Sequence, residues 1–172
     1  MASKAQDVAI YLSQHFHHAW DAFGFFDLQR LMYLAQGWHI ASGRGLLFDG
    51  TLTAHKTAPL SGTVKGLVPL EEMLPSPELD EYDEDFLDSF CLTYGVATRD
   101  AVKRQVDRDD GAWRLTLLIG GEGAVIRPEL MQATFRLMLL DHAETSRKMR
   151  ESQIGTQMQK AVADNVVAFR LR

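Results

Sequence analysis

Residues 28–41 read LQRLMYLAQGWHIA, and apolar side chains recur in this segment at the spacing of one buried helix face. The spacing predicts a helix from Leu28 to Ala41. Its inward positions are Leu28, Leu31, Met32, Ala35 and Trp38. Asp27 is the expected N-cap of this helix, and Gly43 is the expected left-handed residue that ends it.

The opposite face of this predicted helix carries an unusual set of side chains, namely Gln29, Tyr33, Gln36 and Ile40. Gly37 lies among them, although a glycine inside a helix costs about 1 kcal/mol relative to alanine. A glycine is favoured there when another backbone must approach closely. The pattern favours packing within the domain for Tyr33, and Gly37 would admit either a partner or a neighbouring helix. As far as this face stays exposed, we predict that these five residues bind a partner.

The rest of the pattern predicts a mainly α fold, a compact helical domain with a small β-hairpin or short strands and a C-terminal helical tail. We expect the domain to span residues 1–136 and the helical extension residues 137–172. We expect a first helix that a capping box at Ser3 and Gln6 opens, and a short helix from Pro59 to Gly66. Three more helices are expected at Tyr82 to Tyr94, Arg99 to Asp107 and Pro128 to about Met149, the second of them capped by Thr98. The expected strands are Thr51 to His55 and Arg114 to Ile119, and Pro69 to Pro77 is expected to be a loop.

Charge and composition limit the partners and the location of the chain. The net charge of −5 argues against nonspecific nucleic-acid binding, which needs a basic surface. No apolar run approaches the roughly 18 residues that a transmembrane helix needs. The single cysteine, Cys91, cannot form an internal disulfide, and no secretion signal is recognisable at the N-terminus. We therefore expect a cytoplasmic protein that binds other proteins.

No motif of the sequence predicts catalysis, a metal site or a cofactor. Five histidines invite a metal hypothesis: His15, His17, His18, His39 and His55. No cysteine or carboxylate lies at a ligand spacing beside them, so we predict no metal. The nucleophile-elbow, P-loop and dinucleotide-binding fingerprints do not occur, and Cys91 is predicted to be an inert packing residue. An enzyme is therefore the weakest of three functional classes.

The segment Glu78 to Asp88 contains seven carboxylates and no positive charge. Carboxylates are favourable near a helix N-terminus, so a solvated helix start explains this segment, and the pattern favours that interpretation. The alternative is a face that steers a basic partner toward the protein.

The run LQRLMYLAQGWHIASGRGLLFDG resembles the signature of the Panacea antitoxin domain, in which a similar helix leads into a glycine-rich turn. Weaker resemblance continues through residues 53–60, 111–113 and 126–135, so that about the first 136 residues are covered. His55 and Ala58 depart from the family, which has an aromatic residue and a glycine at these positions. Roles of those two family residues do not carry over.

The resemblance implies an antitoxin that binds and neutralises a cognate toxin protein. Its SocA-like members imply a proteolytic adaptor that delivers the toxin to the ClpXP protease. In that interpretation the tail, with Val166, Val167 and Phe169, contacts either the protease or the toxin. The alternative is a phage-related or host protein-interaction module that uses the same helix face without a toxin partner, for example as a homodimer.

Overall fold

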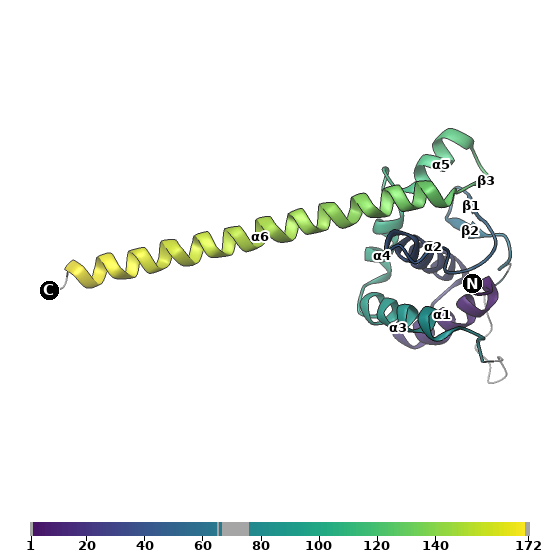
Figure 1. Cartoon of the computed structure of the whole chain (residues 1–172), viewed down its shortest axis with the longest axis horizontal. Coiled ribbons are helices and arrows are strands. Elements are labelled where there is room, and N and C mark those ends of the chain that lie inside the picture. The colour runs from purple at the N-terminus through teal and green to yellow at the C-terminus, as the bar shows by residue number, and fades with distance from the viewer. Residues whose placement is uncertain (1, 65, 67–75, 171–172) are drawn as a thin grey trace. The chain divides into compact units, whose positions relative to one another are not determined.

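The structure is a computed structural model that describes residues 2–64, 66 and 76–170, with side chains through Gln153 and at Thr156. The chain is mainly α, as predicted, with a small three-stranded sheet. It divides into two compact units, Met1–Phe135 and Arg136–Arg172 (Figure 1). Each unit is described separately below.

In the first unit, helix α2 (Phe25–Ala41) is central, because α1 (Ala5–Ala19), α3 (Glu81–Gly95) and α4 (Arg99–Val106) all contact it (Figure 1). The predicted inward residues of α2 are buried at Leu28, Leu31, Met32 and Ala35, and Trp38 is half-buried. Burial of such side chains contributes about 1.5–3 kcal/mol each for the larger ones. The periodicity of α2 therefore predicted this part of the core correctly.

The ends of α2 are set by local hydrogen bonds. The helix begins at Phe25 after Gly24, and Asp27 is its third residue rather than its N-cap. The Asp27 carboxylate still acts at this end, because its Oδ2 accepts a hydrogen bond from the Gly24 N–H at 3.0 Å. At the other end Gly43 has φ +83°, as predicted for a left-handed stop, and its N–H donates to the Ile40 carbonyl.

The predicted capping box at the start of α1 is wrong. The helix begins at Ala5, and Lys4 occupies the N-cap position without a side-chain hydrogen bond. Ser3 is used elsewhere, because its hydroxyl donates to Asp83 at 2.6 Å and its backbone N–H donates to the Leu47 carbonyl. A long-range partner therefore competes successfully with the local cap.

The sheet is antiparallel, with β1 (Leu52–Ala54) between β2 (Pro59–Ser61) and β3 (Ala124–Val125). The strand predicted at Thr51 to His55 is confirmed as β1. The helix predicted to open at Pro59 is wrong, because Pro59 pairs with Ala54 and starts an edge strand, a position where its missing N–H is tolerated. The loop predicted at Pro69 to Pro77 lies mostly outside the described residues.

The helices after the sheet follow the prediction with one exception. Both α3 and α4 lie where expected, and the Thr98 hydroxyl caps α4 by accepting from the Ala101 N–H. The strand predicted at Arg114 to Ile119 is instead helix α5 (Ala112–Gly120). It forms because Trp113 and Thr116, three residues apart, are buried on one side. Helix α6 (Pro128–Arg170) begins at the predicted proline and extends well beyond Met149.

The second unit contains the part of α6 that follows Phe135. Ion pairs one helical turn apart support it, with Lys148 Nζ 2.8 Å from Glu144 Oε1 and Arg147 Nε 3.7 Å from Glu151 Oε1. Among the side chains of this unit that the structure describes, the large apolar ones at Leu137, Leu139, Leu140 and Met149 are exposed. Across the residues that the structure describes, no helix has both the length and the apolar character needed to cross a membrane.

Candidate partner-binding surface

The face of α2 that was predicted to bind a partner lies inside the first unit. Gln29, Tyr33, Gln36 and Ile40 are between 0% and 6% exposed. Gly37 is also buried, since a Cβ placed on it would lie 2.2 Å from Cζ of Phe135. The structure therefore gives these five residues a buried position inside the first unit, not the exposed position that a partner-binding face needs.

The two glutamines of this face hydrogen-bond the backbone of other segments. Gln36 Oε1 accepts from the N–H groups of Leu47 and Phe48 at 2.9 and 3.2 Å. Gln29 Oε1 accepts from the Ser61 N–H at 2.7 Å, and its Nε2 donates to the Val64 carbonyl at 3.2 Å. Buried amides of this kind satisfy backbone groups that would otherwise lose their hydrogen bonds to water. No local pattern predicts these donors and acceptors, because they come from segments 11 to 35 residues away along the chain.

Tyr33 and Gly37 also serve packing. The Tyr33 hydroxyl accepts a hydrogen bond from the Trp113 N–H at 3.3 Å, and burial raises the pKa of Tyr33 to about 12. The absence of a side chain at Gly37 makes room for the ring of Phe135, which packs edge-on against Tyr33 and Trp38. The close approach predicted at Gly37 exists, but it is made by a side chain of the same domain.

The other predicted contact residues, Val166, Val167 and Phe169, lie within α6. Their side chains are outside the described part of the chain. Their role in binding stays a prediction.

An exposed stripe on α3 is the strongest alternative surface. Glu81, Asp85, Asp88, Leu92 and Val96 are spaced by three or four residues, so they share one side of the helix and its C-terminal end. All five are exposed, and Leu92 and Val96 are 79% and 89% exposed. We call these five residues the α3 surface. The α3 surface contains three carboxylates followed by two aliphatic side chains.

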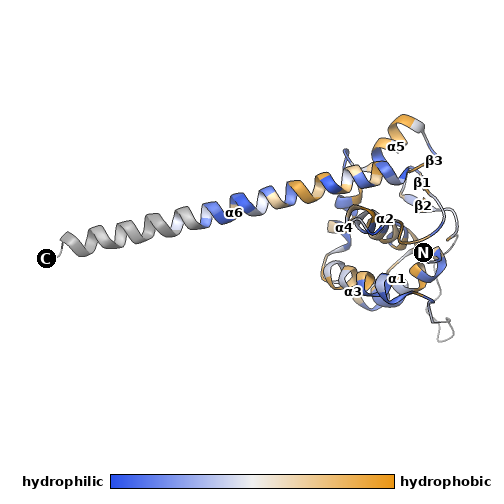
Figure 2. Ribbon diagram, in the orientation of Figure 1, coloured by the Kyte–Doolittle hydropathy of each residue, from blue (hydrophilic) through white to orange (hydrophobic). Residues whose placement is uncertain are grey.

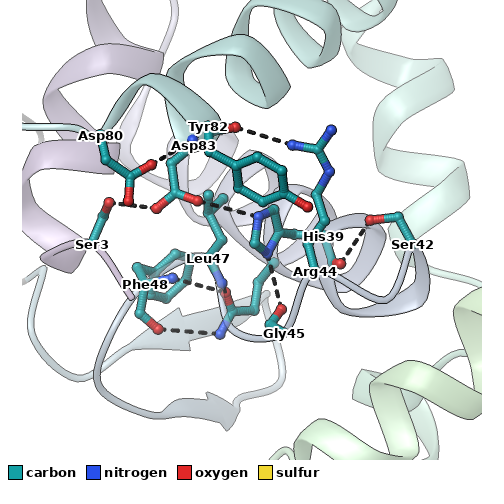
Figure 3. A network of polar contacts seen from close by, with 11 residues as sticks. Ser3, His39, Ser42, Arg44, Gly45, Leu47, Phe48, Asp80, Tyr82 and Asp83 are labelled. Carbon is teal, nitrogen blue, oxygen red and sulfur yellow. Dashed lines mark hydrogen bonds and ion pairs between the residues drawn. The ribbon is translucent and has the colours of Figure 1, made fainter. Parts of the chain in front are cut away.

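A buried network fixes the helix that carries this surface (Figure 3). Asp83 lies on the inward side of α3, where its Oδ2 accepts from the Ser3 hydroxyl at 2.6 Å and its Oδ1 lies 3.3 Å from Nε2 of His39. His39 belongs to α2, and its Nδ1 lies 2.9 Å from the Gly45 carbonyl oxygen, which can only accept. The network therefore ties α3 to α2, to the N-terminal segment and to the turn after α2.

The same network does not present a nucleophile to solvent. Ser3 bonds to Asp83 rather than to His39, and the side chains of His39 and Asp83 are only 2% and 5% exposed. In a hydrolytic triad the histidine must contact the serine to take its proton. This arrangement instead holds α3 in place.

Two residues of neighbouring segments, Arg44 and Tyr11, contact α3 at its start and at its middle. Arg44 NH1 donates to the Tyr82 carbonyl at 3.0 Å, and its guanidinium lies 4.0 Å from the centre of the Tyr82 ring. On the outer side, the Tyr11 hydroxyl of α1 donates to Asp88 Oδ1, and burial together with this carboxylate raises the pKa of Tyr11. The helix that carries the α3 surface is thus held at its start and at its middle.

A hollow adjoins the α3 surface where α3 ends. Val96 is one of the residues that line it, together with Asp21, Arg99, Asp100 and Lys103. Arg99 braces this wall by donating to Asp27 Oδ2 at 2.5 Å and to the Asp21 carbonyl at 3.3 Å. The hollow offers charged groups of both signs next to an exposed aliphatic side chain.

The candidate metal and cysteine positions have ordinary roles in the structure. Within the described ranges, no three histidine, cysteine, aspartate or glutamate side chains are grouped so that they could hold a metal ion. His15 stacks on the ring of Tyr11, and His39 belongs to the network above. Cys91 is buried, and burial followed by the nearby Asp88 charge raises the pKa of its thiol to about 12. A thiol with such a pKa stays protonated at neutral pH and is a poor nucleophile.

Comparison with known proteins adds no relative. No protein-family model, no curated protein and no solved structure matches the chain. The Panacea resemblance therefore rests on the residues of the α2 segment and the weaker segments that follow it.

Proposed function

We propose that this chain is an antitoxin of the Panacea type that binds a cognate toxin protein through the α3 surface. The observation that carries this proposal is the exposure of Leu92 and Val96 in line with Glu81, Asp85 and Asp88 on a helix that a buried network holds in place. Such a surface acts by contact and needs no reactive group.

The chemistry of the surface suits a basic protein partner. Carboxylates that face solvent accelerate the encounter with a positively charged surface and fix its orientation. Aliphatic side chains that become buried on contact supply most of the affinity, because binding energy concentrates in a few desolvated residues. The partner expected for the α3 surface therefore carries basic side chains beside an apolar pocket or ridge.

The use of the α2 residues supports the resemblance. Gln36 and Gly37 belong to the segment that resembles the family signature, and each has a defined structural task. Gly43, in the glycine-rich turn of the same segment, has the positive φ that such a turn requires. Structural roles of this kind are a reason for related proteins to keep the same residues in this segment. The antitoxin function itself is proposed from the similarity of the segment to the family signature.

Coexpression with the product of a short neighbouring gene tests the proposal. We expect that product to stop growth when expressed alone and to be neutralised by this chain. Purified proteins should bind, and Leu92→Ser or Asp85→Lys should weaken binding at least about tenfold, because each removes one component of the surface. Leu118→Ser is the matched control, since Leu118 is equally exposed on a different helix. Full affinity of the Leu92→Ser and Asp85→Lys variants would contradict the proposed surface.

We further propose, from the resemblance to SocA-like antitoxins, that the chain delivers its toxin to the ClpXP protease. Purified ClpXP should degrade the toxin faster in the presence of the chain, because a tether raises the effective concentration of substrate at the protease. A version that ends at His142 should bind the toxin with unchanged affinity and lose this acceleration. Undiminished degradation with the shortened version would exclude a role for residues 143–172.

A further inference from the structure

Asp83 occupies a position of α3 where an apolar side chain would be expected. Helix α3 mixes hydrophobic and hydrophilic residues along its length (Figure 2). Its buried residues are Asp83, Leu87, Phe90, Cys91 and Tyr94. An ionised carboxylate among them is costly unless a partner compensates its charge. The partner is His39, and the contact between the two side chains depends on a proton.

Both ring nitrogens of His39 face oxygen atoms that accept hydrogen bonds (Figure 3). Nδ1 lies 2.9 Å from the Gly45 carbonyl oxygen, and Nε2 lies 3.3 Å from Oδ1 of Asp83, whose Oδ2 already accepts from the Ser3 hydroxyl. A neutral histidine has one N–H, and the Gly45 carbonyl requires it. Neutral His39 beside ionised Asp83 would therefore place a nitrogen lone pair against a carboxylate oxygen. A further proton must lie between Nε2 and Oδ1, bound to one of these two atoms.

No other charged group around this pair takes the place of that proton. The side chains of His39 and Asp83 are almost fully buried, and the Phe86 ring packs edge-on against His39 with 4.8 Å between ring centres. The charged and titratable groups of the surrounding segments are Lys4, Arg44, Asp49, Asp80 and Tyr82. Lys4 is exposed and pairs with Glu78, Arg44 donates to the Tyr82 carbonyl, and the carboxylates of Asp49 and Asp80 accept backbone N–H groups. In the described part of the chain, the Asp83 carboxylate therefore has only His39 and Ser3 as partners.

We propose that the His39–Asp83 pair is a pH-sensitive switch that holds the first turn of α3 and Ser3 against α2 for as long as the pair keeps its proton. Loss of the proton leaves an uncompensated negative charge in the interior, and local opening relieves it by exposing Asp83 to water. A histidine in water changes its charge between about pH 5 and 8, whereas the closed pair keeps its proton to higher pH. The contact is therefore complete at the acidic end of this range and weakens as the pH rises through it.

The switch acts on the start of α3. Further along the helix, Leu87 and Phe90 are buried apolar residues whose packing does not depend on a proton. Of the α3 surface, Glu81 lies in the turn that opens. Because opening releases one proton, the opening constant can rise by up to about tenfold for each unit of pH. The inference does not depend on the proposed toxin binding, since the pair lies inside the fold.

Amide hydrogen exchange of the full chain, measured by NMR between about pH 6 and about pH 9, tests the switch. The amides of Glu84, Asp85 and Phe86 report on the opening of the first turn. After correction for the intrinsic exchange rate, which itself rises with pH, we expect their opening constant to increase at least about tenfold over this range. An opening constant that stays the same from one end of the range to the other would overturn the proposal.

Asp83→Asn tests whether the proton belongs to this pair. The new amide oxygen can accept from Ser3 while the amide N–H donates to Nε2 of a neutral His39, so the network closes without a further proton. We expect the opening constant of this variant to be independent of pH. His39→Gln removes the titrating ring and should also abolish the pH dependence, whereas His17→Gln, at an exposed histidine of α1, is the matched control that should retain it. A pH dependence of wild-type size in Asp83→Asn or in His39→Gln would refute the assignment.

Discussion

Helix α2 buries Gln29, Gln36 and His39, whereas α5 leaves Leu118 and Ile119 exposed to water. The polar residues of α2 lie inside because each has a hydrogen-bond or ion-pair partner from another segment. The apolar residues of α5 lie outside because only Ala112, Trp113 and Thr116 are covered by the domain. In these two helices, the groups of the same domain that pack against or hydrogen-bond a side chain decide whether it is buried, and its polarity alone does not.

Replacing Gln36 with leucine is the strongest test of the α2 side of this comparison. The variant leaves the N–H groups of Leu47 and Phe48 without their acceptor. Each buried donor left unpaired costs about 1–3 kcal/mol, so we expect a loss of about 3 kcal/mol in the free energy of unfolding, measured with urea. Gln6→Leu, at an exposed position of α1, should change it by less than about 0.5 kcal/mol. Equal effects of the two variants would show that Gln36 does not hold the loop.

Gly37→Ala should have the next largest effect, because the new methyl group meets the ring of Phe135 at 2.2 Å. Overpacking costs about 1–3 kcal/mol and outweighs the helix-forming gain of about 1 kcal/mol, so we expect a net loss of about 1–2 kcal/mol. Gly95→Ala is the control with opposite sign, since nothing lies within 4 Å of a Cβ there. Combining Gly37→Ala with Phe135→Leu should recover part of the loss. A stabilised Gly37→Ala protein would mean that Phe135 does not pack there in solution.

Tyr33→Phe probes the same face through its pH dependence. At neutral pH the lost hydrogen bond to Trp113 should cost about 1 kcal/mol. Tyr33 has a pKa of about 12 in the folded protein against 10 when unfolded, so its contribution is complete below pH 10 and is lost as the pH rises toward 12. Between pH 10 and pH 11 the free energy of unfolding of the wild type should fall by more than about 1 kcal/mol, whereas that of the variant should not show this fall. The difference in stability between the two proteins should therefore disappear by pH 11. Tyr82→Phe, at a 54% exposed tyrosine, is the control for loss of a phenolic hydroxyl and should change the free energy of unfolding at neutral pH by less than about 0.5 kcal/mol.

Local signals predicted most of the elements of the fold. Thr98, Gly43 and Pro128 each lie at the helix end that their chemistry predicts. The errors at Pro59 and at Arg114 to Ile119 arise where tertiary contacts decide, through pairing with Ala54 in one case and burial of Trp113 in the other. In such short segments the apolar pattern fits a strand and a helix about equally well.

The candidate surfaces were harder to predict than the fold. The sequence spacing of a glutamine on a helix face is the same whether the glutamine binds a partner or the backbone of another segment. Which segment lies next to the helix depends on tertiary structure and cannot be read from the neighbouring residues. The acidic part of the α3 surface was visible in the sequence, and its extension to Leu92 and Val96 follows the same spacing of three or four residues. The exposure of these two side chains could not be predicted from the sequence, because it depends on which segments pack against α3.

Leu92→Ser and Leu118→Ser should have the smallest effects on stability, and only Leu92→Ser should weaken toxin binding. Both leucines are exposed in the domain, so each variant should lower the free energy of unfolding by about 0.5 kcal/mol, the difference in helix propensity. The first should lose toxin binding, and the second should keep it. A loss above about 2 kcal/mol for either leucine would place it in the core and remove the basis for its surface. An exposed apolar residue can be assigned to a contact only when its removal leaves the fold unchanged and weakens that contact, while removal of an equally exposed residue elsewhere does not.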